Sequence, residues 1–337
     1  MIRIAVSGIP RGFHFPHPDG NWLQREHREQ ILSLSGDIEL LEIPAHRVGE
    51  ADLSRVEVLL AEGGNRSHYR GELDWEDYQR FFVPSLRWVQ LCSTGFRDNV
   101  TPQILDGSVI LTNIPGLHTL PIAESVLAAM LAHAKNFRLR RLDQRARCWR
   151  QRDNDEMSGR TVLIIGLGSI GRAVARLCRS FGMRVLGTRR RAEPVDGVDT
   201  VFAPEELATH LPEADYIVMA VPLTDETEGM LAADAFAAMK RSAYLVNVGR
   251  GGTVDGEALL NALREGQIAG AYLDVFDREP LPLGCESWDI ESVFIVPHDS
   301  HSSPRIGDRV VDAFCRNLQR YLRGDRLMNV CDPRRGY

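Results

Sequence analysis

One stretch of this sequence is more informative than any other: Thr161-Val162-Leu163-Ile164-Ile165-Gly166-Leu167-Gly168-Ser169-Ile170-Gly171. Its first five residues form an uninterrupted apolar run, which predicts a buried β-strand. In the glycine pattern that follows, Gly166 permits a tight turn, Gly168 permits close approach of a pyrophosphate, and Gly171 permits close packing of helix and strand. Apolar residues then recur at helical spacing, so a helix N-terminus would face the phosphates. The stretch therefore predicts a dinucleotide-binding βαβ unit.

The next predicted strand ends in Val185-Leu186-Gly187-Thr188-Arg189-Arg190-Arg191. A site that prefers NAD usually has an acidic residue at this tip, where it accepts hydrogen bonds from the ribose. Thr188 and Arg189 occupy the tip here, and guanidinium groups bind a 2′-phosphate through charge-assisted hydrogen bonds. The sequence therefore favours NADP(H), with Thr188, Arg189 and Arg190 as contacts. The alternative is that these arginines are only solvated and that NAD is the cofactor.

Short apolar runs alternate with helical segments along most of the 337 residues, which predicts an α/β protein with two doubly wound parallel-sheet domains. The apolar segment 123–133 predicts a buried helix, and a long amphipathic helix is expected over 305–322. The predicted strands are 3–7, 38–43, 56–61, 88–92 and 109–113, and then 161–165, 184–188, 216–221, 244–248, 271–275 and 293–296.

Composition excludes several classes of protein. A net charge of −6 argues against general affinity for nucleic acid, and the longest apolar runs are too short for a membrane span. The six cysteines form no CxxC pair and no metal-binding cluster, so we expect reduced thiols, no metal and a cytoplasmic location. The arginine-rich run 138–152 is expected to form a solvated face or a subunit contact.

Three segments with reactive side chains each follow a predicted strand in the last third of the chain: 247–252, 273–282 and 296–301. Arg250 lies between glycines and can present its guanidinium to a carboxylate. His298 can transfer a proton near neutral pH, with Glu279 as its carboxylate partner. Taken alone, Arg250 would usually be part of a surface ion pair, Glu279 a loop residue and His298 a structural residue. Together, behind a dinucleotide loop, they provide the groups that a 2-oxo acid reductase needs.

The chain resembles the D-isomer-specific 2-hydroxyacid dehydrogenase family over nearly its whole length. The resemblance is carried by the segments above and by an ordered series of shorter matches: 113–116, Ala123-Glu124, 221–227, Val254-Asp255, Ala258-Leu259, Trp288 and 323–325. It implies a flavodoxin-like substrate domain formed by residues 1–115 with 299–337, and a Rossmann-like cofactor domain at 116–298. It also implies a homodimer joined largely through the cofactor domains.

The resemblance also assigns roles to individual residues. Arg250 would hold the substrate carboxylate, His298 would be the acid/base, and Glu279 would be its partner. Thr94 and Gly95 would hold the substrate carboxylate through their amides. The substrate-binding residues implied are therefore Thr94, Gly95, Arg250 and His298. Further contacts to the cofactor are implied for Ser169 and Ile170 at the pyrophosphate, Asp274 near the nicotinamide carboxamide, the backbone-lining Val221 and Val248, and Ser300.

The sequence departs from the family pattern at two places. Phe96-Arg97-Asp98 follows Gly95, where one residue usually separates glycine from aspartate. His301 stands where a small residue is usual, and it is either a second titrating group or a loop residue. Arg66, in the segment after the third predicted strand, would meet a second anionic group of a substrate or point to solvent.

We expect an enzyme that transfers a hydride between NADP(H), or NAD(H), and C2 of a small 2-oxo acid, and glyoxylate or hydroxypyruvate reduction fits the arginine-rich tip best. A phosphoglycerate-type dehydrogenase is the nearest enzymatic alternative. A dinucleotide-sensing scaffold of the corepressor type is the alternative outside the enzymes. The partners expected are a small-molecule acid and a second copy of the chain, without nucleic acid or membrane.

Overall fold

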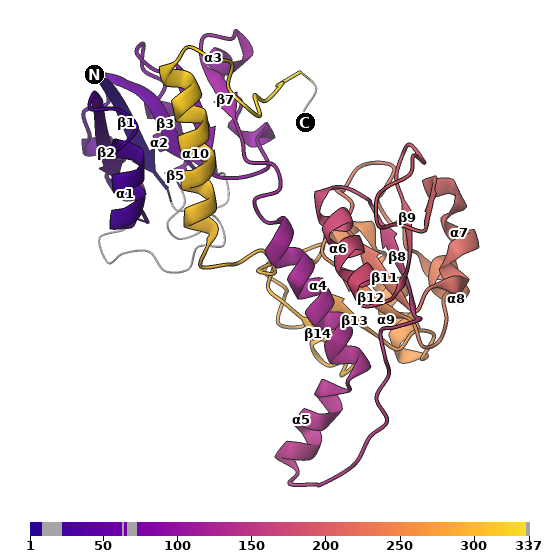
Figure 1. Cartoon of the computed structure of the whole chain (residues 1–337). Helices are drawn as coiled ribbons and strands as arrows, with labels where there is room; N and C mark the ends of the chain where they lie inside the picture. Colours follow the sequence, from indigo (N-terminus) through magenta and orange to yellow (C-terminus); the bar gives the residue numbers. More distant parts are fainter. Residues whose placement is uncertain (9–21, 63, 66–72, 335–337) are drawn as a thin grey trace. The chain divides into compact units, whose positions relative to one another are not determined.

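The computed structural model describes residues 1–8, 22–62, 64–65 and 73–334. The chain divides into two compact units (Figure 1), one formed by Met1–His118 with Ser302–Tyr337 and the other by Thr119–His301. Both boundaries lie three residues beyond the expected ones. The first is displaced because Leu117 packs in the core of the terminal unit, and the second because Ser300 is hydrogen-bonded to Asp274 of the central unit.

The terminal unit is built on a five-stranded sheet whose order is β2-β1-β3-β6-β7, the order of flavodoxin-like folds. All of its pairings are parallel. Its strands are β1 (Ile2–Ser7), β2 (Ile38–Ile43), β3 (Val56–Ala61), β6 (Trp88–Leu91) and β7 (Ile110–Thr112). A separate pair of two-residue strands, β4 (Gly64–Asn65) and β5 (Leu73–Asp74), was not predicted.

Helices cover both faces of this sheet because alternate strand residues point to opposite sides. One face packs against α1 (Arg25–Leu32) and the C-terminal helix α10 (Ile306–Leu322), and the other against α2 (Trp75–Arg80) and α3 (Pro102–Leu105). Trp88 of β6 stacks between Phe314 and Tyr321 of α10, with ring centroids 5.3 and 5.4 Å away. The C-terminal helix α10 is therefore part of the hydrophobic core formed by the N-terminal strands.

The central unit contains a seven-stranded sheet of order β10-β9-β8-β11-β12-β13-β14, again entirely parallel. The order reverses between β8 and β11, which is where α/β sheets of this kind bind ligands. Its short strand β10 was missed in the sequence. The strands are β8 (Thr161–Ile165), β9 (Arg184–Thr188), β10 (Thr200–Phe202), β11 (Tyr216–Met219), β12 (Tyr244–Asn247), β13 (Gly270–Leu273) and β14 (Val293–Ile295).

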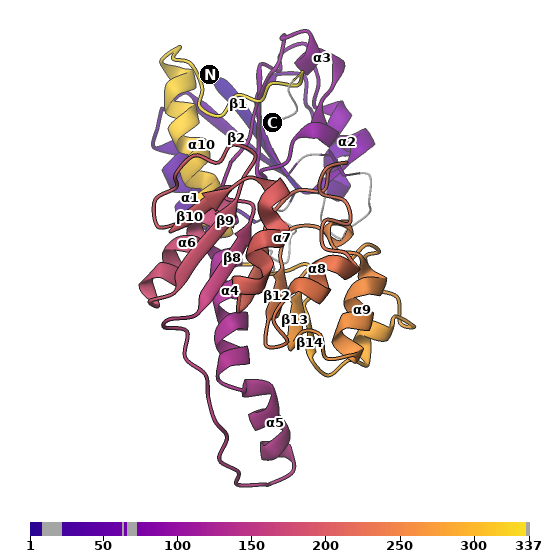
Figure 2. The same ribbon diagram turned by 90° about the vertical axis from the view of Figure 1, so that its right-hand side faces the viewer.

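The two faces of the central sheet are covered by different helices. Val162 and Ile164 of β8 point toward α4 (Thr119–Ala134) and α6 (Ser169–Ser180). Leu163 and Ile165 point toward α7 (Leu207–His210), α8 (Ala233–Ala238) and α9 (Gly256–Arg264). The remaining helix of this unit, α5 (Phe137–Arg145), and the segment after it extend away from the rest of the unit (Figures 1 and 2).

The prediction of a buried helix over 123–133 is only half right. One face of α4 packs against the unit, with Ala123, Val126 and Met130 fully buried or nearly so. The opposite face leaves Leu120 48% exposed, and Ala128 is exposed as well. The cause is that the sheet and α6 pack against one side of α4 only. The rest of the chain therefore leaves some of the apolar side chains of α4 exposed.

Gly171 provides a test of the close packing of α6 on β8. A Cβ added there would lie 2.0 Å from the carbonyl oxygen of Gly166, so Gly171→Ala must push the helix and strand apart. We expect a cost of about 1–3 kcal/mol or more, which lowers Tm by about 2–4 °C per kcal/mol in a unit of this size. Gly284→Ala is the control, because its added Cβ meets nothing within 4 Å. Equal melting temperatures of the two variants in thermal unfolding would contradict this account.

Candidate active site

The predicted residues of the central unit lie at one edge of its sheet. Since the strands are parallel, the segments after β8, β9, β11, β12, β13 and β14 all leave from their carboxyl ends on the same side. These segments, with the tip of β9, hold every cofactor-binding and acid/base residue that the sequence indicated. Thr94 and Gly95, which were indicated as substrate-binding residues, belong to the terminal unit. The topology thus brings together residues that are more than a hundred positions apart in the chain.

The loop after β8 has the geometry of a phosphate-binding turn. Gly166 has a φ of 101°, and a Cβ added to it would lie 2.6 Å from Cγ1 of Val221. A Cβ added to Gly168 would meet nothing within 4 Å, so the backbone there is open to a ligand. Helix α6 begins at the next residue, Ser169, and its first N–H groups have no partner within the helix. A pyrophosphate fits this arrangement.

The tip of β9 lies against that loop. The carbonyl oxygen of Thr188 accepts hydrogen bonds from the N–H groups of Gly166 and Leu167, both at 3.1 Å. Thr188 is 2% exposed, and within the described part of the chain its Oγ1 has no hydrogen-bond partner. An orphaned buried hydroxyl at this place is suited to a ligand oxygen.

The arginines that follow are held only loosely by acidic side chains. Nη2 of Arg189 lies 3.9 Å from Glu193, and Nη2 of Arg190 lies 2.8 Å from Glu226. The Arg190 pair is largely exposed, and such pairs contribute about 0–1 kcal/mol. Both guanidinium groups can therefore exchange a carboxylate for a phosphate at little cost.

Glycines allow the loops after β11, β12 and β13 to touch through their backbones. A Cβ added to Gly249 would lie 2.6 Å from the carbonyl oxygen of Val221, and one added to Gly251 would lie 2.0 Å from the carbonyl carbon of Phe276. Val248, the neighbour of Gly249, is buried. These contacts explain why Arg250 stands among glycines.

Arg250 itself has a fixed backbone and an exposed side chain. Its carbonyl oxygen accepts hydrogen bonds from Nδ2 of Asn247 at 3.2 Å and from Oγ1 of Thr253 at 2.6 Å. Its Nη1 donates to the carbonyl oxygen of Gly249 at 2.7 Å. Among the described contacts, no hydrogen bond or ion pair joins the guanidinium to Glu279 or His298.

The structure places Glu279 and His298 in direct contact. Nδ1 of His298 lies 2.7 Å from Oε2 of Glu279, and the other oxygen, Oε1, accepts a hydrogen bond from the N–H of Phe276 at 2.9 Å. The carboxylate is therefore fixed before it orients the imidazole. Because Nδ1 is used in this way, Nε2 is the nitrogen that can exchange a proton with a substrate.

Asp274 and Ser300 form a second pair, which the sequence had indicated only as two separate cofactor contacts. The N–H of Ser300 donates to Oδ1 of Asp274 at 3.0 Å, and Oγ of Ser300 donates to Oδ2. The carbonyl oxygen of Ser300 accepts from Oγ of Ser125, on α4, at 3.3 Å. Burial raises the pKa of Asp274, and the hydrogen bonds from Ser300 oppose that rise.

His298 has a second neighbour, His301, whose role the sequence left open. The two imidazole rings are perpendicular, with an interplanar angle of 85° and centroids 6.0 Å apart. No feature of the sequence other than the unusual residue type marked this contact. It depends on the turn at His298, whose φ of 53° lies in the left-handed region.

Thr94 and Gly95 belong to the terminal unit, where they follow β6. Oγ1 of Thr94 donates to the carbonyl oxygen of Ile114 at 3.0 Å, and both residues are exposed. The additional residue after Gly95 is accommodated because Phe96 is buried, 5% exposed, before the 3-10 turn Arg97–Asn99. Arg66 lies outside the described residues.

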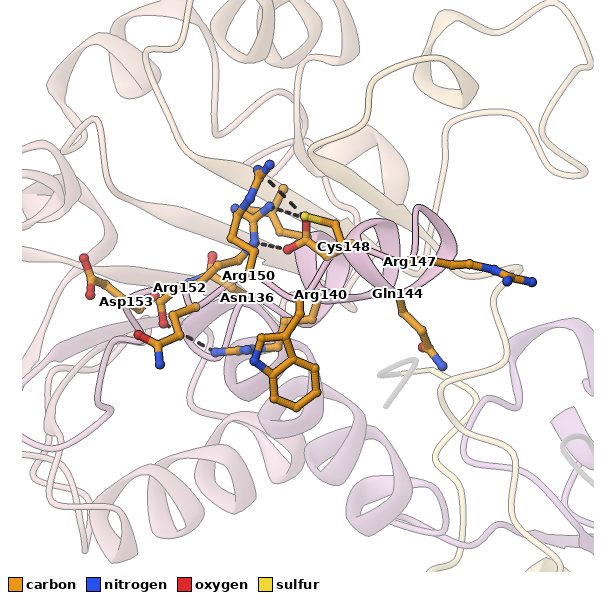
Figure 3. Close-up of a pocket in the computed structure, with 12 residues that line it drawn as sticks. Asn136, Arg140, Gln144, Arg147, Cys148, Arg150, Arg152 and Asp153 are labelled. Atoms are coloured by element: carbon orange, nitrogen blue, oxygen red, sulfur yellow. Dashed lines mark hydrogen bonds and ion pairs between the residues drawn. The ribbon is translucent and has the colours of Figure 1, made fainter.

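One hollow in the described structure is lined by residues outside these loops. It has a volume of about 1020 Å³ and lies between α5 and the returning segment. Figure 3 shows the arginines around it, of which Arg152 contacts Asp143 at 2.5 Å and Arg140 contacts Asn154 at 2.9 Å. The predicted solvated or subunit-contacting face therefore lies on α5 and the segment after it. Some of its arginines are paired with side chains of the same region, such as Asp143 and Asn154.

Among the described residues, no group of three or more histidine, cysteine, aspartate or glutamate side chains is arranged to hold a metal ion. In the same residues, every helix is too short or too polar to cross a membrane.

Comparison with known proteins now identifies the family. Residues 127–300 match the model for the NAD binding domain of D-isomer specific 2-hydroxyacid dehydrogenases. A glyoxylate reductase of Korarchaeum cryptofilum is 35% identical over 74% of this chain and 76% of its own.

Two solved structures cover the whole chain. An NADPH-dependent glyoxylate/hydroxypyruvate reductase from Sinorhizobium meliloti, in complex with NADP and sulfate, matches with a TM-score of 0.74 at 25% identity, over 100% of both chains. A D-isomer specific 2-hydroxyacid dehydrogenase from Xanthobacter autotrophicus, in complex with NADPH, matches with a TM-score of 0.75 at 27% identity, over 100% of this chain and 99% of its own. The chain belongs to the D-isomer specific 2-hydroxyacid dehydrogenase family, whose members are NAD(P)-dependent oxidoreductases.

Proposed function

We propose that the protein reduces a small 2-oxo acid of the glyoxylate or hydroxypyruvate type to its 2-hydroxy acid with NADPH. The observation that carries the proposal is the hydrogen bond between Glu279 and His298, 2.7 Å long, at the same sheet edge as the phosphate loop. The relatives whose names include glyoxylate reductase support the substrate class. The terminal unit is proposed as the substrate domain.

His298 is proposed as the general acid. Nδ1 donates its hydrogen to Glu279, so a proton on Nε2 is delivered to the carbonyl oxygen as that oxygen becomes an alkoxide. The carboxylate of Glu279 stabilises the imidazolium that carries this proton. NADPH, when bound, supplies the hydride that C2 of the oxo acid accepts.

Arg250 is proposed to bind the substrate carboxylate. Its backbone is clamped by Asn247 and Thr253, whereas its exposed guanidinium retains donors beyond the bond to Gly249. A guanidinium forms paired hydrogen bonds to a carboxylate, which fixes the acid's orientation as well as its position. The exposed amides of Thr94 and Gly95 are proposed to assist.

The cofactor is proposed to be held by the phosphate loop and by the tip of β9. Ser169, Ile170 and the glycines around them would contact the pyrophosphate, and Asp274 with Ser300 would lie near the nicotinamide, lined by Val221 and Val248. Thr188, Arg189 and Arg190 would bind the 2′-phosphate. Relatives solved with NADP or NADPH support this preference.

The reaction is tested by following NADPH absorbance at 340 nm with glyoxylate, hydroxypyruvate, pyruvate, phosphohydroxypyruvate and a larger oxo acid. We expect the first two to be reduced fastest. His298→Ala should lower kcat on the order of 10²–10⁴-fold, as expected for the loss of general acid catalysis.

A preference for phosphohydroxypyruvate would indicate the phosphoglycerate type. Inactivity on every acid with both NADPH and NADH would indicate a dinucleotide-sensing scaffold, and full activity of His298→Ala would overturn the role of that residue.

The coenzyme preference is tested with the double variant Arg189→Ala/Arg190→Ala. A charge-assisted hydrogen bond contributes about 1.5–3 kcal/mol. The loss of one such bond should raise KM for NADPH about 10–100-fold and the loss of both should raise it further, while KM for NADH stays within about threefold. Arg184→Ala is the matched control, because it removes an arginine from the opposite end of β9, where Arg184 pairs with Glu213. A parallel rise of both KM values in the double variant would refute the assignment.

We also propose a homodimer joined through α4 and α5 of the cofactor domain. The support is a set of exposed apolar side chains on α4, on α5 and in the segment after α5: Leu120 is 48%, Phe137 59%, Leu142 42% and Trp149 100% exposed. Such patches usually mark association sites.

Sedimentation equilibrium should therefore give twice the chain mass of 37.8 kDa. Trp149→Ala should weaken the dimer about 30-fold or more, while Leu283→Ala, which removes an equally exposed apolar side chain elsewhere (96% exposed), should not. A monomeric wild-type protein would refute the proposal.

A further inference from the structure

We propose that His301 is a positioning residue that fixes the plane of the His298 imidazole. This inference rests on the proposed role of His298 as the general acid. The contact that carries it is the perpendicular packing of the two rings, whose centroids are 6.0 Å apart at an interplanar angle of 85°.

A single hydrogen bond does not fix an imidazole in space. The bond from Nδ1 to Glu279 sets the direction of one ring edge, but the ring can still swing about the Nδ1···Oε2 line. The side chain of His298 is 39% exposed, so little surrounding protein opposes this rotation. A second contact, on a ring at right angles, removes the remaining freedom and thereby fixes where Nε2 points.

The backbone that carries the His301 ring is held in place, because the residue before it is bonded at three points. Ser300 is 5% exposed. Its N–H and Oγ are bonded to Asp274, and its carbonyl oxygen is bonded to Ser125 of α4. Three bonds on one buried residue leave the backbone at His301 few alternatives. Hydrogen bonds therefore tie the turn that follows His298 to Asp274, after β13, and to helix α4.

The position of Nε2 matters because proton transfer requires a hydrogen-bond distance to the reacting oxygen. A displacement of about 1 Å can cost about 10²-fold in rate. A small residue in place of His301 leaves the hydrogen bond to Glu279 intact but removes the ring that packs against His298. We therefore expect a loss of kcat smaller than that caused by His298→Ala.

The test compares His301→Ala and His301→Phe for kcat and KM, each in the wild-type and the His298→Ala background. His301→Ala should lower kcat about 10-fold, with both KM values within about twofold. His301→Phe restores a flat ring without nitrogens and should return kcat to within about threefold of the wild type. In the His298→Ala background, His301→Ala should change the residual rate less than twofold, because His301 acts only through His298.

His210→Ala is the matched control, since His210 also packs against an aromatic ring, that of Phe202, with centroids 4.0 Å apart. It should leave kcat unchanged. Thermal unfolding of each variant separates a loss of positioning from a loss of folding.

The outcomes distinguish this inference from the proposed function. If His298→Ala retains turnover, the proposed acid is wrong whatever His301 does. If His298→Ala is inactive but His301→Ala is as active as the wild type, the positioning role is refuted alone. If His301→Phe is as impaired as His301→Ala while folded, packing is not the cause, and the inference is refuted as well.

Discussion

The seven strands of the central sheet all run in the same direction, and this constraint determines where the chemistry lies. A parallel sheet sends every strand's carboxyl end to one edge, so a loop after each strand can contribute to a single site. The glycine loop follows β8, the arginines proposed to contact the cofactor follow β9, and Arg250 follows β12. The Glu279–His298 pair is formed by the loops after β13 and β14, which are neighbours in the sheet.

Close contact of these loops depends on small residues and on buried hydrogen bonds. Gly251 lets the Arg250 backbone touch Phe276, and the N–H of Phe276 holds the carboxylate of Glu279. Asp274 holds Ser300 after the next strand, although burial raises the pKa of its carboxyl group. The site therefore combines one exposed pair, Glu279 with His298, which is proposed to transfer the proton, with one buried pair, Asp274 with Ser300, which holds the turn.

The sequence was sufficient for the fold class and for nearly every strand, because apolar runs and glycine spacing depend on local structure. It also supplied each residue of the Glu279–His298 pair, since both follow strands. It did not predict β10, a short strand at the sheet edge. It also did not predict the exposed face of α4, because apolar composition does not show which side of a helix the rest of the chain covers. The contacts of Ser300 with Asp274 and Ser125, and of His301 with His298, depend on a left-handed turn at His298. Local sequence does not encode such a turn for a residue other than glycine.

The central proposal is that the carboxylate of Glu279 orients His298, the histidine proposed to protonate the oxo acid. The most direct measurement is the rate of hydroxypyruvate reduction by NADPH in Glu279→Gln, which keeps the size of the side chain and removes its charge. The account predicts a fall in kcat on the order of 10²-fold with KM for the acid little changed, because Arg250 is untouched. A variant that turns over as fast as the wild type would contradict it.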